Sequence, residues 1–365
     1  MRQLRIGVIG AGGIAQVEHI PNLLRLPALF RLAGVYDPSR TAREFVTSRH
    51  GVPTFATEDA LFALELDAVL VASPDALHHG HVKKALGLGL HVFCEKPLCY
   101  DPADIDDLIA ARERAGKVLQ VGYMKRFDPS YEAALRLMPG VKEKLSYVSV
   151  EVNDPDAWPF IRHHDWARGE DVDKALIADA QARQREQAER AVGRKLEGLA
   201  FKGYVGPYCS AIVHDVNAVH GLLEAMGVPE GQVSGAELFA HGNGGQASVR
   251  LMDGQAVWNM AHVTLPALSD YRERISFWFE DASLELEFPS PYLNHQPTRL
   301  TLRRSNGHVL HVEDIRTGYE EAFVEELKGF WSAIQGESPC RNSAEQARRD
   351  MALLAGLARH YVDHH

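Results

Sequence analysis

The first part of the chain alternates short apolar runs with segments of helical periodicity. Runs rich in Leu, Ile and Val are typical of strands buried on both faces of a parallel sheet. Such runs occupy residues 4–9, 30–36, 68–72, 91–94 and 118–121. Apolar positions at helical spacing follow at residues 14–25, 79–88 and 103–115, the last segment capped by Asp101. The alternation predicts a doubly wound parallel sheet, an α/β domain that spans residues 1–123.

The rest of the chain, residues 124–365, alternates single apolar and polar positions, as half-buried strands do. Six segments follow this pattern: 145–152, 235–240, 247–251, 257–265, 274–279 and 284–288. The pairs Asn243-Gly244, Asp253-Gly254 and Asn306-Gly307 predict hairpin turns. Helices are predicted at 209–226, 320–335 and 344–360, the last beginning with the capping box Ser343 and Gln346. We therefore expect an α+β domain with a large, mostly antiparallel open sheet.

An excursion at about 154–205 fits neither pattern. Its middle, residues 173–199, is rich in Ala, Arg, Gln and Glu and is therefore prone to form a helix. Its apolar positions are mostly alanine. The excursion is either a solvated helical arm, or a lid or subunit contact.

Composition narrows the class of protein. A length of 365 residues suggests two domains, and the net charge of −10 argues against nucleic acid or an anionic membrane as a partner. The four cysteines are scattered without a C-x-x-C pair, which disfavours a disulfide framework or a thiolate metal site. No apolar stretch approaches the ~20 residues of a membrane helix, and the first strand begins too early to leave room for a signal peptide. We expect a cytoplasmic protein.

The turn after the first strand, Gly10-Ala11-Gly12-Gly13-Ile14-Ala15, fits G-x-G-x-x-G/A. In that motif Gly10 permits the tight turn, Gly12 lets the backbone approach a pyrophosphate, and Ala15 allows close helix packing. The helix that opens here directs N–H groups and its positive dipole end at phosphates. The alternative is a turn that serves only the chain's geometry. A strand before it and a helix after it favour a dinucleotide site.

Asp37 ends the second strand, where this fold places the acid that binds the cofactor's ribose. An anionic Asp37 accepts hydrogen bonds from ribose hydroxyls and repels a 2′-phosphate, although Arg40 lies close enough to soften that preference. Asp37 could also be a helix N-cap followed by Pro38. NAD is the predicted cofactor, and NADP remains possible.

Cys94-Glu95-Lys96-Pro97 follows the fifth strand, at the carboxyl edge of the sheet where ligands of such folds bind. Most lysines lie on solvated faces, but Lys96 follows a buried strand and precedes a proline. A cis bond there would fix its backbone tightly. A lysine held beside the positive nicotinamide would be able to exchange a proton at neutral pH.

The glycine turn, Ala72-Ser73-Pro74, Glu95-Lys96-Pro97 and the run from Gly122 to Phe127 together resemble the glucose–fructose oxidoreductase / inositol dehydrogenase / MocA (Gfo/Idh/MocA) family. The resemblance covers nearly the whole chain and is weakest in the excursion. It implies an NAD(P)-dependent oxidoreductase of sugars, cyclitols or related polyols, with a Rossmann domain and a second sheet that often makes dimer contacts. A homodimer or homotetramer through the C-terminal sheet is therefore expected.

The resemblance also assigns site residues. It places Glu95 and Lys96 beside the nicotinamide ribose and the substrate, with Lys96 in the proton relay. The implied cofactor-binding residues are Gly10, Gly12, Gly13, Ile14, Ala15, Asp37, Ser73, Pro74, His78, Glu95 and Lys96. The substrate-binding residues expected from the resemblance are Lys96, Tyr123, Arg126, Ser210 and His214, and the polar segment of the excursion adds Asn153, His163, His164 and Asp165; no metal ligands are expected.

The run from Val213 to His220 is similar to the family's D-x-x-x-H-D-x-D helix. A histidine on an apolar helix face is often only a core residue, but the match favours His214 as the group that takes the hydroxyl proton. Asp215 either orients it or faces solvent. The family's acid four residues earlier is Ser210 here, so His214 lacks its usual partner on that helix face.

The polar segment that begins the excursion offers a replacement. Asn153, His163, His164 or Asp165 would supply hydrogen bonds to substrate hydroxyls if the segment folds over the nicotinamide end of the cleft, and Asp165 would replace the lost carboxylate. The alternative is a solvated loop. Neighbouring histidines in a loop rarely bind one metal ion together.

The preferred function is hydride transfer between the nicotinamide cofactor and a carbohydrate, glycoside or cyclitol. One alternative on the same scaffold is an NAD-dependent glycoside hydrolase or lyase that oxidises its sugar transiently. Another is a non-catalytic NAD-binding sensor, which would need no lysine, so the intact Glu95-Lys96-Pro97 argues against it.

Overall fold

The computed structural model describes residues 2–138, 144–155 and 158–365, which divide into two compact units. Unit 1 comprises Met1–Tyr123, Arg162–Ala191 and Phe323–Arg349, and unit 2 comprises Met124–Ile161, Val192–Ala322 and Asp350–His365. The first stretch of unit 1 ends at Tyr123, the residue at which the sequence divided the chain. Residues 162–191 and 323–349, which we assigned to the second domain, lie with the first unit.

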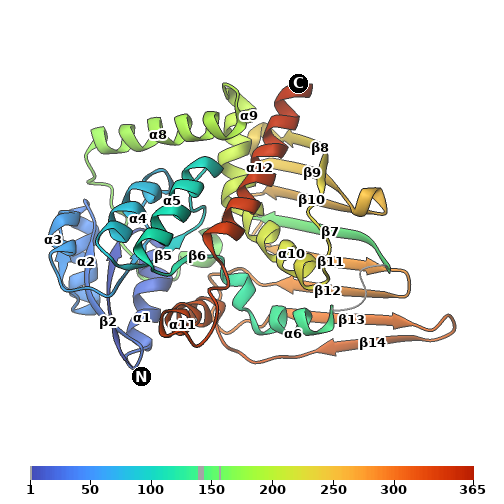
Figure 1. The fold of residues 1–365 in the computed structure, drawn as a ribbon, viewed down its shortest axis with the longest axis horizontal. Helices are drawn as coiled ribbons and strands as arrows, with labels where there is room; N and C mark the ends of the chain where they lie inside the picture. The colour runs from blue at the N-terminus through green and yellow to red at the C-terminus, as the bar shows by residue number, and fades with distance from the viewer. Residues whose placement is uncertain (1, 139–143, 156–157) are drawn as a thin grey trace. The chain divides into compact units, whose positions relative to one another are not determined.

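Unit 1 contains a six-stranded sheet in the order β3-β2-β1-β4-β5-β6 (Figure 1). Its strands are β1 (Leu4–Ile9), β2 (Phe30–Tyr36), β3 (Thr54–Phe55), β4 (Ala68–Val71), β5 (His91–Glu95) and β6 (Leu119–Gly122). All neighbouring strands pair in parallel, which confirms the predicted doubly wound sheet. The two-residue β3 was not predicted, because so short a strand carries no periodicity.

The helices of unit 1 include those predicted at 14–25, 79–88 and 103–115; no bounds were predicted for the helices Arg40–His50 and Glu58–Phe62. The helices of this unit are the π-helix η1 (Ala15–His19), α1 (Ile20–Arg25), α2 (Arg40–His50), α3 (Glu58–Phe62), η2 (Asp75–Leu77), α4 (His78–Gly87), α5 (Pro102–Ala115), α8 (Lys174–Val192) and α11 (Ala322–Gln335). Asp101 caps α5, as predicted, by accepting the Ala103 N–H. Ser39, and not Asp37, is the N-cap of α2.

Two segments join unit 1 from far along the chain. Leu327, Phe330 and Trp331 of α11 belong to the same buried cluster as Ile6 and Phe93 of the sheet. This burial explains why residues 323–349 belong to unit 1, since apolar side chains on an amphipathic helix are most stable against a core.

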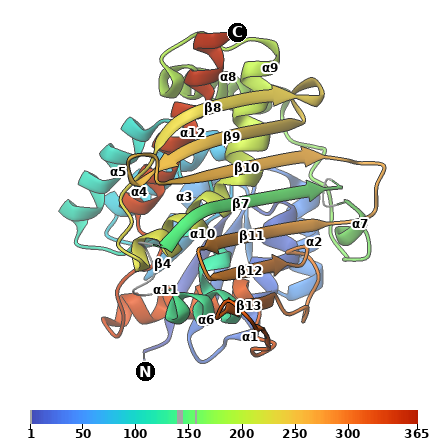
Figure 2. The same cartoon turned by 90° about the vertical axis from the view of Figure 1, so that its right-hand side faces the viewer.

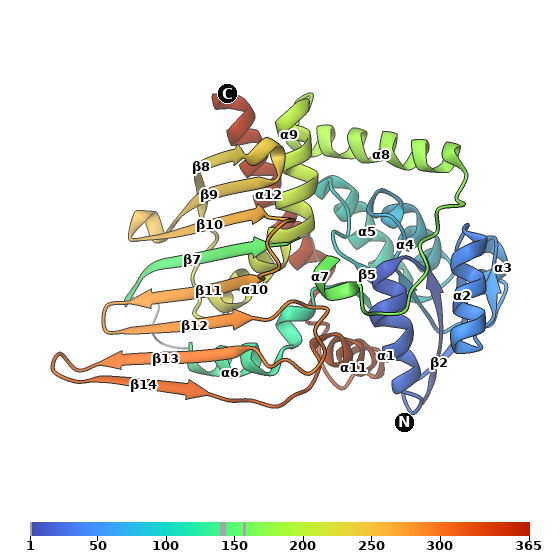
Figure 3. The ribbon, with the colours of Figure 1, turned by 180° about the vertical axis from the view of Figure 1, so that it is seen from behind.

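The second such segment is α8, which confirms the helix expected in the excursion and runs alongside α4 and α5 (Figures 1 and 3). Gln184 donates to the Tyr100 hydroxyl at 2.8 Å, and Gln187 donates to the Ala76 carbonyl at 3.0 Å. Arg190 reaches Asp104 at the start of α5 at 2.5 Å. Polar contacts therefore hold α8 to unit 1, as its alanine-rich sequence requires.

Unit 2 contains an eight-stranded sheet in the order β14-β13-β12-β11-β7-β10-β9-β8 (Figure 2). Its strands are β7 (Leu145–Asp154), β8 (Gln232–Phe239), β9 (Gly244–Leu251), β10 (Ala256–Thr264), β11 (Arg272–Phe279), β12 (Ala282–Phe288), β13 (Arg299–Ser305) and β14 (Leu310–Ile315). Only β7 and β10 pair in parallel, which confirms a mostly antiparallel sheet. The predicted turn pairs lie between β8 and β9, β9 and β10, and β13 and β14.

The helical segments of unit 2 are η3 (Met124–Phe127), α6 (Pro129–Leu137), α7 (Trp158–Ile161), α9 (Gly198–Gly203), the π-helix η5 (Tyr204–Ile212), α10 (Val213–Ala225), η6 (Ala240–Gly242), η7 (Met252–Gly254) and the part of α12 (Ala344–His364) from Asp350 onward. The predicted capping box begins α12, because Ser343 and Gln346 exchange hydrogen bonds. None of the helices in the described ranges is long and apolar enough to cross a bilayer.

Candidate functional site

The glycine turn of unit 1 has two glycines with different requirements. Gly10 has φ +96°, and a Cβ there would lie 2.5 Å from the Ala72 carbonyl oxygen. At Gly12 no heavy atom lies within 4 Å of the position that a Cβ would take. Gly10 therefore serves the fold, since only glycine adopts this conformation without strain. Gly12 leaves open space beside the turn.

That space is part of a cavity of about 670 Å³. The cavity brings together the predicted residues Gly10, Gly12, Asp37, Ser73 and Pro74. The predicted Gly13, Ile14 and Ala15 belong to the first turn of the helix that follows. A volume in this range is typical of small-molecule sites.

Asp37 lies at the end of β2 and lines the cavity. Its carboxylate accepts the Ala11 N–H and the Ser39 N–H, each at 2.7 Å. Burial raises the pKa of Asp37, and these two hydrogen bonds oppose the shift. Arg40 points its guanidinium at Glu44, at 2.6 Å. It is therefore engaged on the surface of α2.

The Glu95-Lys96-Pro97 turn follows β5, with a cis bond between Lys96 and Pro97. His78 is fully buried and places Nδ1 2.8 Å from the Pro97 carbonyl and Nε2 2.8 Å from the Ser73 carbonyl. Both partners are carbonyl oxygens, so the ring nitrogen that carries the hydrogen donates to its carbonyl. His78 thus links the cavity wall at Ser73 to the turn that carries Lys96.

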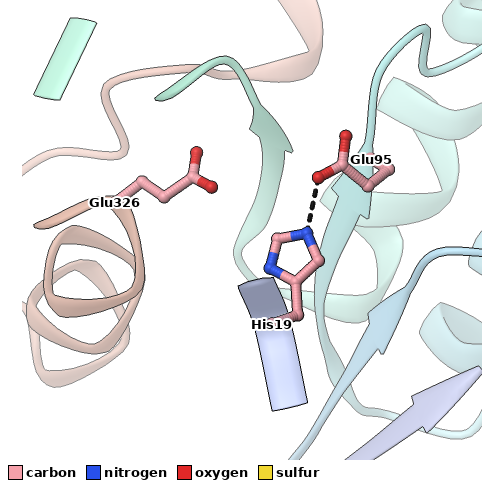
Figure 4. Close-up of side chains that lie close together, drawn as sticks. All are labelled: His19, Glu95 and Glu326. Atoms are coloured by element: carbon pink, nitrogen blue, oxygen red, sulfur yellow. Dashed lines mark hydrogen bonds and ion pairs between the residues drawn. The ribbon is translucent and has the colours of Figure 1, made fainter. Parts of the chain in front are cut away.

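Behind this turn lies a buried cluster that the sequence did not predict, formed by His19, Glu95 and Glu326 (Figure 4). His19 Nε2 lies 2.5 Å from Glu95 Oε1, while neither Glu326 oxygen has a hydrogen-bond partner among the residues that the structure describes. Burial raises the pKa of Glu326, and the nearby Glu95 raises it further. Burial alone would raise the pKa of Glu95, but the His19 hydrogen bond lowers it.

The three side chains each offer one ligand atom within 4.8 Å of the others, a spacing that a cation could bridge. In the structure two of these atoms are joined by a hydrogen bond instead. Glu95 is therefore held by His19 within a buried cluster, directly before Lys96.

Unit 2 contains a second buried charged cluster. Lys125 Nζ donates to Asp215 at 2.8 Å and also to Glu273, and all three side chains are buried. Burial lowers the pKa of Lys125, but the two carboxylates outweigh this effect and raise it. Burial, with the charge of Asp215, raises the pKa of Glu273 to about 7. A carboxyl group with such a pKa can exchange a proton near neutrality.

His262 adds a neutral imidazole to this region. It pairs with Val152 across the sheet, as Glu273 does from the other side, so all three side chains share one face. Burial and the positive Lys125 lower the pKa of His262 to about 4. Neither ring nitrogen has a hydrogen-bond partner in the described part of the chain.

The histidine helix α10 places its two predicted residues differently. Asp215 is fully buried on Lys125, so the alternative that it faces solvent is wrong. His214, one position earlier, is half-buried, and Ser210 is exposed on the π-helix η5. The i−4 relation assumed for Ser210 belongs to an α-helix, and a π-helix widens the turn.

Tyr123 and Arg126 are the predicted substrate residues of the Gly122–Phe127 run, but Lys125 is the residue of that run that reaches Asp215. Arg126 packs against Gly221 and lies 3.9 Å from Glu224. These positions lie several residues along α10 from Asp215, roughly 10 Å at the ~1.5 Å rise of a helix. Tyr123 is buried in unit 1, where its carbonyl accepts from Asn342 at 2.8 Å.

The structure does not gather the predicted lid residues. Asn153 follows Val152 on β7 and therefore points to the opposite face from Glu273. Asp165 is 72% exposed and pairs with Arg49 of α2 at 3.7 Å. His163 is exposed, His164 is half-buried, and their rings lie 4.5 Å apart. A buried carboxylate that no local pattern predicted is present at Glu273, which pairs with Lys125.

The sequence profile of an oxidoreductase family with an NAD-binding Rossmann fold, GFO_IDH_MocA, matches residues 4–123. This domain therefore matches the NAD-binding Rossmann domain of the Gfo/Idh/MocA family over residues 4–123. It is an NAD(P)-binding domain, and the structure agrees, because Gly12 leaves a cradle that a larger side chain would fill. Gly10, Gly12, Asp37, Ser73 and Pro74 are the cavity residues that would hold the dinucleotide.

Relatives with curated names match in this region. Inositol 2-dehydrogenase of Paracoccus denitrificans is 36% identical over 134 residues, which cover 36% of this chain and 40% of that protein. The inositol 2-dehydrogenase of Corynebacterium glutamicum (strain R) is 32% identical over 140 residues, 38% of this chain and 41% of that one. The matched region thus spans only about two fifths of these relatives.

Solved structures share the fold over the full length. UDP-N-acetylglucosamine 3-dehydrogenase GnnA from Acidithiobacillus ferrooxidans aligns with a TM-score of 0.70 at 20% identity, covering 99% of this chain and 98% of that one. KijD10, a 3-ketoreductase from Actinomadura kijaniata in complex with NADP and TDP-benzene, aligns with a TM-score of 0.71 at 18% identity, with 99% and 98% coverage. At these identities the likeness establishes the fold of both units.

Proposed function

We propose that the chain is an NAD(P)-dependent oxidoreductase that transfers hydride between the nicotinamide and a hydroxyl or ketone of a carbohydrate, glycoside or cyclitol. The observation that carries the proposal is the shared edge of the unit 1 sheet. Because all its strands are parallel, the dinucleotide cavity and the Glu95-Lys96-Pro97 turn lie at the same carboxyl ends. The named relatives, which act on inositol and nucleotide sugars, support this substrate class.

The roles follow from the chain's own groups. Bound dinucleotide supplies the hydride chemistry. Lys96 Nζ and the His214 ring are proposed to hold and move the hydroxyl proton, and Asp37 to accept hydrogen bonds from the ribose. The Lys125, Asp215 and Glu273 cluster holds the start of α10, where His214 lies. Glu273, in the same cluster, is a second group that can exchange a proton near neutrality.

A substrate panel tests the proposal. Cyclitols, aldoses, nucleotide sugars and glycosides are incubated with NAD⁺ and NADP⁺, and NADH or NADPH is followed by absorbance, with products identified by mass spectrometry. We expect net reduced cofactor with at least one polyol or sugar. No turnover with any member, together with intact cofactor binding, would favour the sensor alternative.

Two variants test the assigned proton groups. Lys96→Met and His214→Ala should each lower turnover by about 10²–10⁴, because general acid–base catalysis contributes on that order. NADH affinity should change far less. Lys83→Met and His308→Ala, at exposed positions, are the matched controls. Near-normal turnover in Lys96→Met or His214→Ala would remove that residue from the mechanism.

One observation favours a second candidate. Residues of the excursion, among them Gly169, Leu176 and Gln184, line the cavity together with the glycine turn, and this additional wall suits a cofactor that stays bound through each catalytic cycle. An NAD-dependent glycoside hydrolase or lyase, which oxidises and re-reduces its substrate, works in this way. In the same panel it would release a cleaved product with no net NADH.

We also infer a cytoplasmic homo-oligomer formed through the unit 2 sheet. Trp278 is 44% exposed on the face opposite the fully buried Phe277, next to Tyr147 on β7. A large aromatic side chain on an open sheet face suits a subunit contact. Light scattering after size exclusion tests this, with Trp278→Ser expected to shift the mass toward a single chain.

A further inference from the structure

A segment from the excursion forms an additional wall of the dinucleotide cavity. We call residues 166–191 the strap. Its start is tied to the first helix, because Gln16 donates to the Ala167 carbonyl at 2.9 Å and accepts the Ala167 N–H at 2.8 Å. Trp166 lies 3.8 Å from the position a Cβ on Gly13 would take. Figure 3 shows the chain running past α1 and α2 on its way into α8.

The strap is tied a second time at the start of α2, by Asp171. Its carboxylate accepts the Ser39 hydroxyl, the Arg40 N–H at 2.9 Å and the Thr41 N–H at 3.1 Å. Gly169 allows this close approach, since a Cβ on it would lie 2.8 Å from the Ser39 side chain. The Ser39 hydroxyl lowers the pKa of Asp171 to about 2. The side chain is therefore anionic at neutral pH.

These contacts saturate the N-terminus of α2. The Ala42 N–H donates to the Ser39 hydroxyl oxygen at 3.0 Å, and Asp171 takes the two preceding amides. A helix N-terminus is a phosphate site only if its N–H groups are free to point at the anion. Here Ser39 binds two carboxylates: its N–H donates to Asp37, and its hydroxyl donates to Asp171.

The next turns of the strap present an apolar surface. Leu176 and Ile177 are 53% and 43% exposed, yet both line the cavity, together with Ala180. Large apolar side chains that face a pocket are typical of a surface covered by a ligand. Gln184 then anchors the helix on Tyr100. The strap thus lines the cavity with an apolar patch, and it holds a charged group, Asp171, against Ser39, which is itself a lining residue.

We infer that the strap is part of the dinucleotide site, and that Asp171 makes the site select NAD(H) over NADP(H). A 2′-phosphate at the end of β2 would meet two carboxylates and no free amide, and like charges brought together oppose binding. Leu176 and Ile177 would cover the adenine. The inference rests on the dinucleotide part of the proposed function and is independent of the substrate.

The test compares NADH and NADPH affinity, measured by fluorescence titration, in the native protein, Asp171→Asn and Glu170→Gln. Glu170 is the matched control, because it is exposed, does not line the cavity and carries the same charge. We expect the native protein to favour NADH at least tenfold. Asp171→Asn should reduce that ratio at least tenfold by tightening NADPH binding, while Glu170→Gln leaves it unchanged.

A second variant tests the wall itself. Leu176→Ser should weaken NADH and AMP binding at least fivefold, while Leu88→Ser, which is 54% exposed and outside the cavity lining, should not. Three outcomes would overturn this inference and leave the proposed function standing. They are equal NADH and NADPH affinity in the native protein, an equal change of both affinities in Asp171→Asn, and unchanged NADH and AMP binding in Leu176→Ser. Failure of every variant and of the native protein to bind either dinucleotide would overturn the proposed function as well.

Discussion

The two glycines of the dinucleotide turn should separate folding from binding. In Gly10→Ala the new Cβ would lie 2.5 Å from the Ala72 carbonyl oxygen and 2.7 Å from the Ser73 nitrogen, both backbone atoms that cannot rotate away. The φ of +96° adds strain of about 1–2 kcal/mol for a residue with a side chain. Overpacking adds about 1–3 kcal/mol. We therefore expect Gly10→Ala to lose about 2–5 kcal/mol of stability without any ligand.

Gly12→Ala is the matched substitution. Gly12 is not one of the glycines with positive φ, and its Cβ would meet no atom within 4 Å. Replacing such a glycine changes stability by less than about 1 kcal/mol, and can increase it. The added methyl group would instead occupy the space that this motif reserves for the pyrophosphate. NADH affinity should fall at least a hundredfold.

Urea denaturation followed by circular dichroism gives the stability of both variants without cofactor, and NADH fluorescence titration gives the affinity. The reasoning is refuted if Gly12→Ala is destabilised as much as Gly10→Ala. It is equally refuted if Gly12→Ala binds NADH as the native protein does.

The two buried charged clusters give predictions on stability against pH. The raised pKa of Glu326 means that the folded state keeps a proton that the unfolded state loses above about pH 4.5, so stability from this group is present below that pH and is lost as pH rises. The glutamine of Glu326→Gln does not titrate. In urea denaturation, the free energy of unfolding of this variant should therefore rise relative to that of the native protein, by up to about 1.4 kcal/mol per pH unit above pH 4.5. Parallel pH profiles of the two proteins would contradict this. Lys125→Met leaves Asp215 and Glu273 buried without their cation and should cost about 3–5 kcal/mol at pH 8. The loss should shrink at pH 5, where the unpaired carboxyl groups take up protons, and a loss independent of pH would assign it to packing alone.

Local patterns were sufficient wherever one segment determines its own structure. The apolar run 30–36 coincides with β2, and Asp101 caps α5, because burial on both faces and a capping side chain are encoded within a few residues. Gly10 and Gly12 were identified for the same reason, since the turn, the strand and the helix are contiguous. Lys96 was found through its place after a buried strand.

Tertiary structure decided the rest, because the partners lie far apart in the chain. Asp171 meets Ser39 across 132 residues, and Glu273 meets Lys125 across 148. The excursion's alanine-rich composition does not show that one of its residues contacts the start of α2. No motif distinguishes Lys125 from the neighbouring Arg126. By itself the sequence determined the strands, the glycine turn and the class of cofactor. Only the folded chain decided which carboxylates meet Ser39 and Lys125, because burial and charge pairing depend on neighbours that sequence spacing does not specify.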